Sequence, residues 1–138
     1  MILKVNSLLI GRTMRLVVDI VWFKRDLRLR DHLPLYQVTG NPRPVLLLYV
    51  FEPILINDQH YSERHWRFVM QSLIDLQTQL SEFQTKILVV VGPIQKVFDA
   101  LLSQWDIANV YSHEEIGIEV KYARDRAMQK YLSQRHIK

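Results

Sequence analysis

The sequence has 138 residues, of which 49% are hydrophobic and 23% charged, and it contains no cysteine. This composition excludes a wholly disordered chain, a collagen-like fibre and a disulfide-stabilised scaffold, and it is typical of one globular domain. Lys and Arg number 18 against 14 Asp and Glu, and because the basic residues are scattered and often lie beside acids, we interpret the surplus as solvated surface rather than a polyanion-binding patch.

We do not interpret the start of this sequence as a signal peptide. The apolar stretch 5–10 is too short for a signal peptide and no small-residue cleavage site follows it. No other apolar run approaches the roughly 20 residues of a membrane span. We predict that residues 1–13 form an extension or a disordered arm and that one domain occupies 14–138. The lack of thiols suits a reducing compartment, and we expect a cytoplasmic location.

Four apolar runs predict strands that are buried on both faces. They lie at 16–23, 44–51, 86–92 and 107–111. None alternates strictly between apolar and polar residues, which favours a parallel sheet covered on both sides. The last residues, 136–138, are typical of the start of a further strand.

Helix-length segments separate these strands. Asp31 is predicted to cap a short helix that ends near Val38. Apolar residues spaced three or four apart predict amphipathic helices over 62–83, 94–105 and 118–133. The alternation of strands and helices predicts an α/β fold: a doubly wound, mostly parallel sheet of four to five strands, Rossmann-like, with helices on both faces.

Ligands of such sheets bind beyond the carboxyl ends of the strands. No Gly-rich phosphate loop and no nucleophile elbow follows any predicted strand, which disfavours dinucleotide dehydrogenases, P-loop hydrolases and serine hydrolases. The residues that follow the predicted strands are Lys24, Arg25 and Asp26, then Glu52 and Pro53, then Gly92 and Pro93, and finally Ser112 to Glu115.

Two groups among these residues have more than one interpretation. His113, Glu114 and Glu115 are suited to a hard metal or to acid–base chemistry, but adjacent residues of an extended chain point in opposite directions. We therefore predict a polar loop and no metal site there. An internal ion-pair network is favoured over an anion clamp for Arg25, Asp26, Arg28 and Asp31. The three tryptophans are interpreted as core residues: Trp22, Trp66 and Trp105.

The segment VWFKRDLRLRDHLPL, residues 21–35, resembles the opening motif of the photolyase and cryptochrome family, a strand followed by W-F-R-x-D-L-R-x-x-D-N. Similarity continues through YVFEPIL at 49–55, SERHWRFVMQSLIDLQTQL at 62–80, KILVVVG at 86–92 and YSHEEIGIEVKYARDRAMQKYL at 111–132. It covers the chain from about Met14 to its end.

The match to the opening motif includes two departures. Asp26, Arg28 and Asp31 agree with the family pattern, whereas Lys24 stands where the family usually has Arg. His32 replaces the usual Asn.

This resemblance implies the amino-terminal α/β domain of a blue-light flavoprotein, a domain that carries an antenna chromophore of folate, deazaflavin or flavin type. In the family, DNA repair by a deoxyribodipyrimidine photo-lyase belongs to a helical domain that binds FAD and the flipped lesion, and nothing in these 138 residues matches it. We therefore expect an antenna-binding domain that passes excitation to FAD in a helical partner domain and is not catalytic alone. It would meet damaged DNA only in the full-length protein, and its open apolar surface would favour self-association.

The family resemblance and the predicted strand ends together indicate which residues could bind an antenna chromophore. No catalytic residue and no metal ligand is predicted.

Two alternative functions remain open: a standalone small-ligand or nucleotide-binding module of related topology without photochemistry, and an interaction domain with a vestigial crevice. The candidate antenna-binding residues are Lys24, Arg25, Phe51, Glu52, Pro53, His113, Glu114 and Glu115. The residues expected to be structural or interfacial are Asp26, Arg28, Asp31, Arg124 and Asp125.

Overall fold

The computed structural model describes residues 2–4, 15–40, 42–59, 61–113 and 119–138. These residues form five strands, all paired in parallel, in the spatial order β1-β4-β3-β2-β5. The strands are β1 (Ile2–Lys4), β2 (Val17–Phe23), β3 (Val45–Phe51), β4 (Ile87–Val91) and β5 (Asp106–Tyr111). The predicted parallel α/β sheet is confirmed.

The strand order reverses next to β2. From β2 the chain moves through β3 to β4 on one side, and then returns to place β5 on the other side of β2. Val21 in β2 is accordingly paired with Leu47 of β3 and with Tyr111 of β5. The carboxyl ends of β2, β3 and β5 therefore deliver their following residues to the same edge of the sheet, which is where ligands of this architecture bind.

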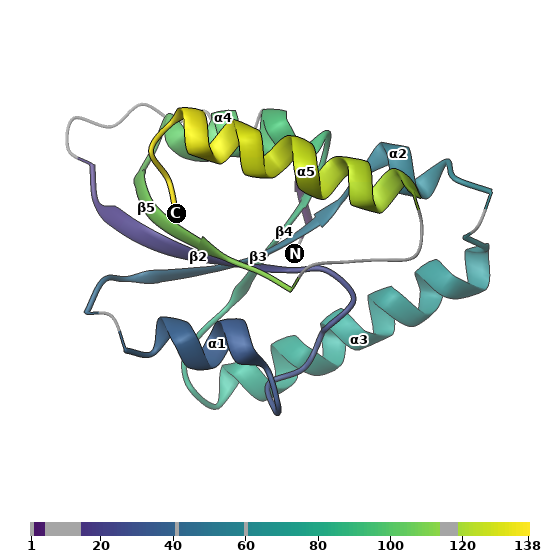
Figure 1. Ribbon diagram of the computed structural model, residues 1–138. Coiled ribbons are helices and arrows are strands. Elements are labelled where there is room, and N and C mark those ends of the chain that lie inside the picture. Colours follow the sequence, from purple (N-terminus) through teal and green to yellow (C-terminus); the bar gives the residue numbers. More distant parts are fainter. Residues whose placement is uncertain (1, 5–14, 41, 60, 114–118) are drawn as a thin grey trace.

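Helices cover both faces of the sheet (Figure 1). Helices α1 (Leu33–Val38) and α3 (Glu63–Ser81) lie on one face, and α4 (Ile94–Leu102) and α5 (Glu119–Gln134) lie on the other. A further short helix, α2 (Pro53–Ile56), follows β3 directly. The long predicted helices are confirmed, and the result is a three-layer arrangement.

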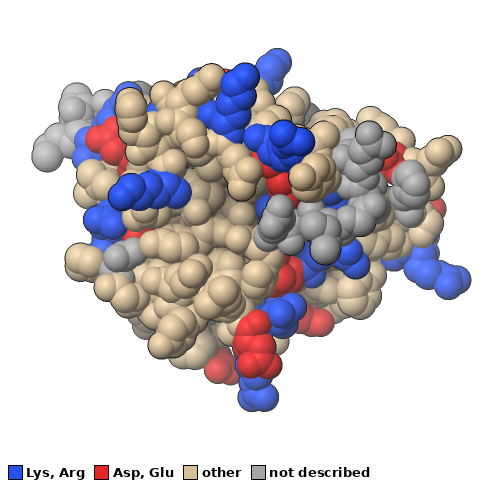
Figure 2. Space-filling model, in the orientation of Figure 1, with Lys and Arg blue, Asp and Glu red and all other residues tan. Residues whose placement is uncertain are grey.

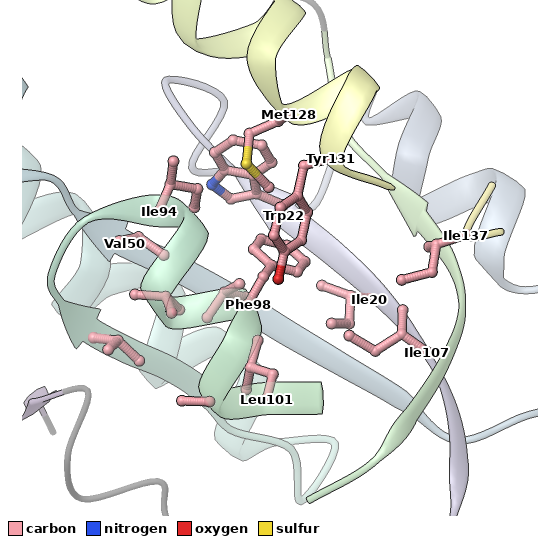
Figure 3. Packing of buried hydrophobic residues seen from close by; sticks show 14 of the residues in the cluster. Ile20, Trp22, Val50, Ile94, Phe98, Leu101, Ile107, Met128, Tyr131 and Ile137 are labelled. Carbon is pink, nitrogen blue, oxygen red and sulfur yellow. The ribbon is translucent and has the colours of Figure 1, made fainter. Parts of the chain in front are cut away.

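Each side of the sheet has its own apolar cluster. Ile20 and Trp22 of β2 pack with α4 and α5, whereas Val21 and Phe23 pack with α3. Figure 3 shows Trp22, Phe98 and Met128 gathered at the centre of the first cluster, and the rings of Trp22 and Phe98 meet edge to face with centroids 5.9 Å apart. Both faces of β2 are covered, which explains why its sequence does not alternate.

The cap of α1 differs from the prediction. Asp31 has a φ of 50°, in the left-handed region, and turns the chain instead of capping the helix. The N-cap is His32, whose backbone is extended and whose Nδ1 accepts a hydrogen bond from the N–H of Leu35 at 3.2 Å. An N-cap residue needs an extended backbone, so a residue in the left-handed region cannot take that role.

The two ends of the described chain both contact the sheet. Ile2–Lys4 fall within the predicted extension or arm, but the structure instead pairs them with β4, with Ile2 opposite Val89. Residues 1 and 5–14 lie outside the described residues. At the other end, the N–H of Lys138 donates to Ala108 and its carbonyl accepts from Val110, which is the pattern of a parallel strand beside β5. No strand is assigned over 136–138, so the strand start predicted there stays a prediction that these two bonds support.

The surface carries charge of both signs. On the face drawn in Figure 2, Lys and Arg side chains are spread out, and several lie beside Asp or Glu. Among the described residues, no helix combines the length and the apolar character needed to cross a bilayer.

The central cluster gives a direct test of the packing. Phe98 is completely buried, so Phe98→Ala should lower the free energy of unfolding by about 3–5 kcal/mol, measured by chemical denaturation. Phe83 is 68% exposed and provides a matched control, since Phe83→Ala should have little effect. Equal losses in the two variants would contradict the assigned core.

Candidate functional site

A cavity of about 240 Å³ opens at the carboxyl ends of β2 and β3. Its walls come from these strand ends, from α3 and from α5, and we call it the crevice. The strand ends contribute Trp22, Lys24 and Glu52, and α3 contributes Trp66. The crevice therefore lies at the edge of the sheet where the topology predicts a ligand site.

Aromatic side chains form one wall of the crevice. Ser62 caps α3 by accepting a hydrogen bond from the N–H of His65, and this places His65 and Trp66 in the first turn of the helix. The Trp66 ring lies 4.8 Å from that of His65, 5.4 Å from that of Tyr61 and 6.0 Å from that of Phe51, measured between centroids. Such a wall suits a flat, conjugated ligand, because aromatic rings attract one another in offset and edge-to-face contacts.

Two polar atoms of this wall are buried without a hydrogen-bond partner in the described part of the chain. Among the described residues, neither the hydroxyl of Tyr61 nor Nε1 of Trp66 makes a hydrogen bond. Buried polar groups are nearly always paired, so these two atoms are available to a ligand with matching polar atoms. The ammonium of Lys121 lies over the Tyr61 ring, 5.0 Å from its centroid, and adds a cation beside them.

A buried ion-pair network forms the floor. It consists of Lys24, Glu52, Arg124 and Asp125, which we call the floor network. Arg124 Nη1 donates to Glu52 Oε2 at 2.5 Å, and Arg124 Nε donates to Asp125 Oδ1 at 3.0 Å. Lys24 Nζ donates to the same Asp125 oxygen at 3.1 Å. Two cations and two anions balance, so the network ties β2, β3 and α5 together without a net buried charge.

Two cations lie close to His65 at the rim of the crevice. Burial lowers the pKa of His65, and the positive charges of Lys121 and Arg25 lower it further. The protonated form of the imidazole is disfavoured because the positive charges of Lys121 and Arg25 repel it. A negatively charged group of a ligand would be favoured at the same place.

A second polar cluster lies at the ends of β2 and β5. Asp26 accepts a hydrogen bond from the backbone N–H of Lys24 at 2.9 Å, and His113 Nδ1 lies 2.6 Å from its other oxygen, Oδ2. His32 Nε2 contacts the same oxygen. Burial raises the pKa of the Asp26 carboxyl, but the bonds with His32, the Lys24 N–H and His113 outweigh it and hold the pKa below its usual range.

The candidate antenna residues have different places in the structure. Lys24, Arg25 and Glu52 line the crevice, and Phe51 is buried behind Trp66. Pro53 occupies the first turn of α2 and is not part of the lining. His113 lies in the second cluster, away from the crevice lining. The predictions for Glu114 and Glu115 lie outside the described residues.

Most of the residues expected to be structural make internal contacts. Arg28 donates to the carbonyls of Arg30 and Asp31, which holds the loop after β2. Arg124 and Asp125 belong to the floor network, and Arg124 also lines the crevice.

Sequence reasoning missed part of the aromatic wall. Trp66 was interpreted as a core residue, and it does pack against the cluster around Phe23, but its indole also faces the crevice. Tyr61, His65 and Lys121 were not singled out at all. The available signal was the pattern Y-S-x-x-H-W, in which a helix cap places aromatic residues at the start of a helix that follows a strand end.

A family model and curated relatives both match this chain. The family model for DNA photolyase matches residues 19–138. Cryptochrome-1 of Erithacus rubecula is 30% identical over 116 residues, which is 82% of this chain but 18% of that protein. The chain thus spans less than a quarter of the length of this relative.

Solved structures share the fold. The cryptochrome of Synechocystis sp. PCC6803 superposes with a TM-score of 0.81 at 25% identity, over 91% of this chain and 27% of that one. The archaeal photolyase of Sulfolobus tokodaii, solved with two FAD molecules, has a TM-score of 0.77 at 27% identity, over 88% of this chain and 28% of that one.

The floor network can be tested by breaking and then rebalancing it. Arg124→Met leaves the Glu52 carboxylate buried without its guanidinium, and we expect it to lower the free energy of unfolding by about 3–5 kcal/mol. The double variant Glu52→Gln with Arg124→Met removes both charges and should recover much of that loss in the same denaturation experiment. A double variant that is no more stable than the single one would contradict the pairing.

Proposed function

The chain belongs to the DNA photolyase family, and from this premise we propose that it binds a planar antenna chromophore, of flavin type, in the crevice. Bound there, the chromophore would supply absorption of blue light. The full-length protein would be a light-driven photolyase or cryptochrome in which a helical, FAD-binding domain uses the excitation. In that protein, the residues of this chain would bind the chromophore and orient its ring.

The main support for this proposal is a pair of buried polar atoms in the aromatic wall that have no hydrogen-bond partner among the described residues. The Tyr61 hydroxyl and Trp66 Nε1 are buried without partners in the described part of the chain, while the rings around them offer flat apolar surface. A flavin or deazaflavin ring combines a flat aromatic body with carbonyl and ring-nitrogen acceptors at its edge. The indole N–H and the phenol can both donate to such acceptors.

The size and charge of the crevice support the same class of ligand. Its volume of about 240 Å³ is below the roughly 300–1,000 Å³ of pockets that enclose a whole drug-sized ligand, so it suits a ring system whose tail extends outward. Arg25 and Lys121, whose charges lower the pKa of His65, would face an anionic tail, such as a phosphate. The Sulfolobus tokodaii photolyase, described with a second FAD and the implication of a novel light-harvesting cofactor, supports a flavin.

Flavin binding tests the proposal. Purified chain is titrated with FMN, and quenching of flavin fluorescence reports the affinity. Tyr61→Phe removes one donor and keeps the ring, and Trp66→Phe removes the other donor and leaves a smaller aromatic ring, so each should weaken binding by at least about 3- to 10-fold. Trp105→Phe is the matched control, because Trp105 packs against the other cluster. Absence of FMN binding together with thermal stabilisation by ATP would favour a nucleotide-binding module instead.

The pKa of His65 gives an independent test of the charge at the rim. In the free protein we expect the ring to titrate below its ordinary value of 6.5, measured by NMR. Its contribution to stability is therefore present above pH 6.5 and is lost as the pH falls through the lowered pKa. Arg25→Gln should move the pKa upward, and so should FMN, whose phosphate offsets the cations. An unchanged pKa in both cases would contradict the positive rim.

A further inference from the structure

A site of different chemistry lies next to the crevice, where the strand order reverses between β2 and β5. Three separate segments meet there: the loop after β2 supplies Asp26, the cap of α1 supplies His32, and the segment after β5 supplies His113. We call these three residues the histidine–aspartate cluster. Within the described ranges, it is the only group of three His or acidic residues whose side-chain donor atoms converge in this way.

The geometry of the cluster is that of a small coordination site. One donor atom from each residue lies within 4.8 Å of the other two, and the two imidazole rings are 4.9 Å apart between centroids. Asp26 Oδ1 already accepts the N–H of Lys24, which leaves Oδ2 facing both rings. Two imidazole nitrogens and one carboxylate oxygen are a donor set that suits zinc and other divalent first-row metals.

The cluster combines a buried side with an open one. The His32 side chain is fully buried, with its Nε2 against Asp26 Oδ2. The His113 side chain is 35% exposed, so one side of the cluster opens to solvent. A buried donor atom aimed at the cluster and an open side together provide a ligand position and a path of entry.

We propose that Asp26, His32 and His113 form a binding site for a divalent transition-metal ion of the zinc class. His32 Nε2, His113 Nδ1 and Asp26 Oδ2 would be the protein ligands, and water would complete the coordination on the exposed side of His113. Ligand atoms bound at about 2.0–2.2 Å in a tetrahedral site lie roughly 3.3–3.6 Å from one another. His113 Nδ1, at 2.6 Å from Asp26 Oδ2, and His32 Nε2 must therefore both move away from that oxygen to admit the ion. The ion would join the loop after β2, the start of α1 and the end of β5.

Metal binding requires each ring to present an unprotonated nitrogen to the ion, Nε2 at His32 and Nδ1 at His113. At His113 the proton moves from Nδ1 to Nε2. At His32 it moves from Nε2 to Nδ1, and the hydrogen bond from the Leu35 N–H to Nδ1 is given up. This cap is worth a factor of roughly 2 to 30 in an equilibrium. With its proton on Nδ1, the buried His32 ring would also face the Leu35 N–H donor, so the first turn of α1 would have to move when the metal binds.

His32 is also the residue that departs from the family motif. Asn stands at this position in the motif that the sequence resembles, and Asn is a good N-cap residue. His32→Asn should therefore keep α1 and the fold while it removes one metal ligand. This substitution separates a metal role of His32 from its capping role.

The experiment is a calorimetric titration of metal-free, tag-free protein with Zn²⁺. We expect one Zn²⁺ per chain at micromolar affinity, and His32→Asn and His113→Asn should each weaken binding by at least roughly tenfold. His136→Asn is the matched control, since His136 is exposed and distant in sequence from the cluster, and it should leave the affinity unchanged. Circular dichroism checks that each variant is folded.

A second measurement reports on the cluster itself. Zn²⁺ should shift the NMR signal of the Leu35 amide, because that N–H loses its acceptor, whereas the amide of Thr39, which donates to the Tyr36 carbonyl at the far end of α1, should stay in place. Absence of Zn²⁺ binding, an affinity unaffected by His32→Asn and His113→Asn, or a Leu35 amide that does not move would each overturn the proposal.

Discussion

The buried guanidinium of Arg124 is the group on which the carboxyl edge of the sheet depends. An isolated charge at this depth would cost several kcal/mol, and Arg124 avoids that cost by bonding to Glu52 at the end of β3 and to its neighbour Asp125. It also lies 5.1 Å from the centre of the Trp22 ring. Because Glu52 follows β3 whereas Arg124 lies in α5, α5 cannot shift along the sheet without breaking the charged hydrogen bond between them. The walls of the crevice are therefore positioned before any ligand enters, which reduces the loss of conformational entropy on binding.

The fold was predictable because its signals are local. Each central strand is a continuous apolar run, and in β2 consecutive side chains such as Ile20 and Val21 enter opposite clusters, so both had to be apolar. The long helices repeat apolar residues every three or four positions, a pattern that needs no knowledge of the partner. The short elements carried no such signal. Ile2–Lys4 is too short for a pattern and is identified only by its pairing with β4, and the cap of α1 depends on the backbone angle at Asp31.

The candidate site was predictable only in part, for a physical reason. Lys24, Arg25 and Glu52 follow strands directly, and the topology of a parallel sheet places such residues at one edge. Tyr61 and Lys121 reach the crevice through the docking of α3 and α5, which no local pattern specifies. The histidine–aspartate cluster is harder still, because Asp26 and His113 are 87 positions apart and meet only because β5 returns to the side of β2. Adjacent acids beside His113 drew attention in the sequence, whereas the side-chain contacts of His113 with described residues are to Asp26 and His32, which come from other segments.

Lys24 is the residue that the two sites share. Its backbone N–H donates to Asp26 at 2.9 Å, and its ammonium donates to Asp125 at 3.1 Å and to the His113 carbonyl at 2.8 Å, while its side chain lines the crevice. Coupling between two sites requires an element with two arrangements that each ligand stabilises differently. Three directed bonds and an exposure of 8% hold Lys24 in one arrangement. A chromophore in the crevice and a metal in the cluster would therefore bind independently, each using a different side of the same fixed strand end.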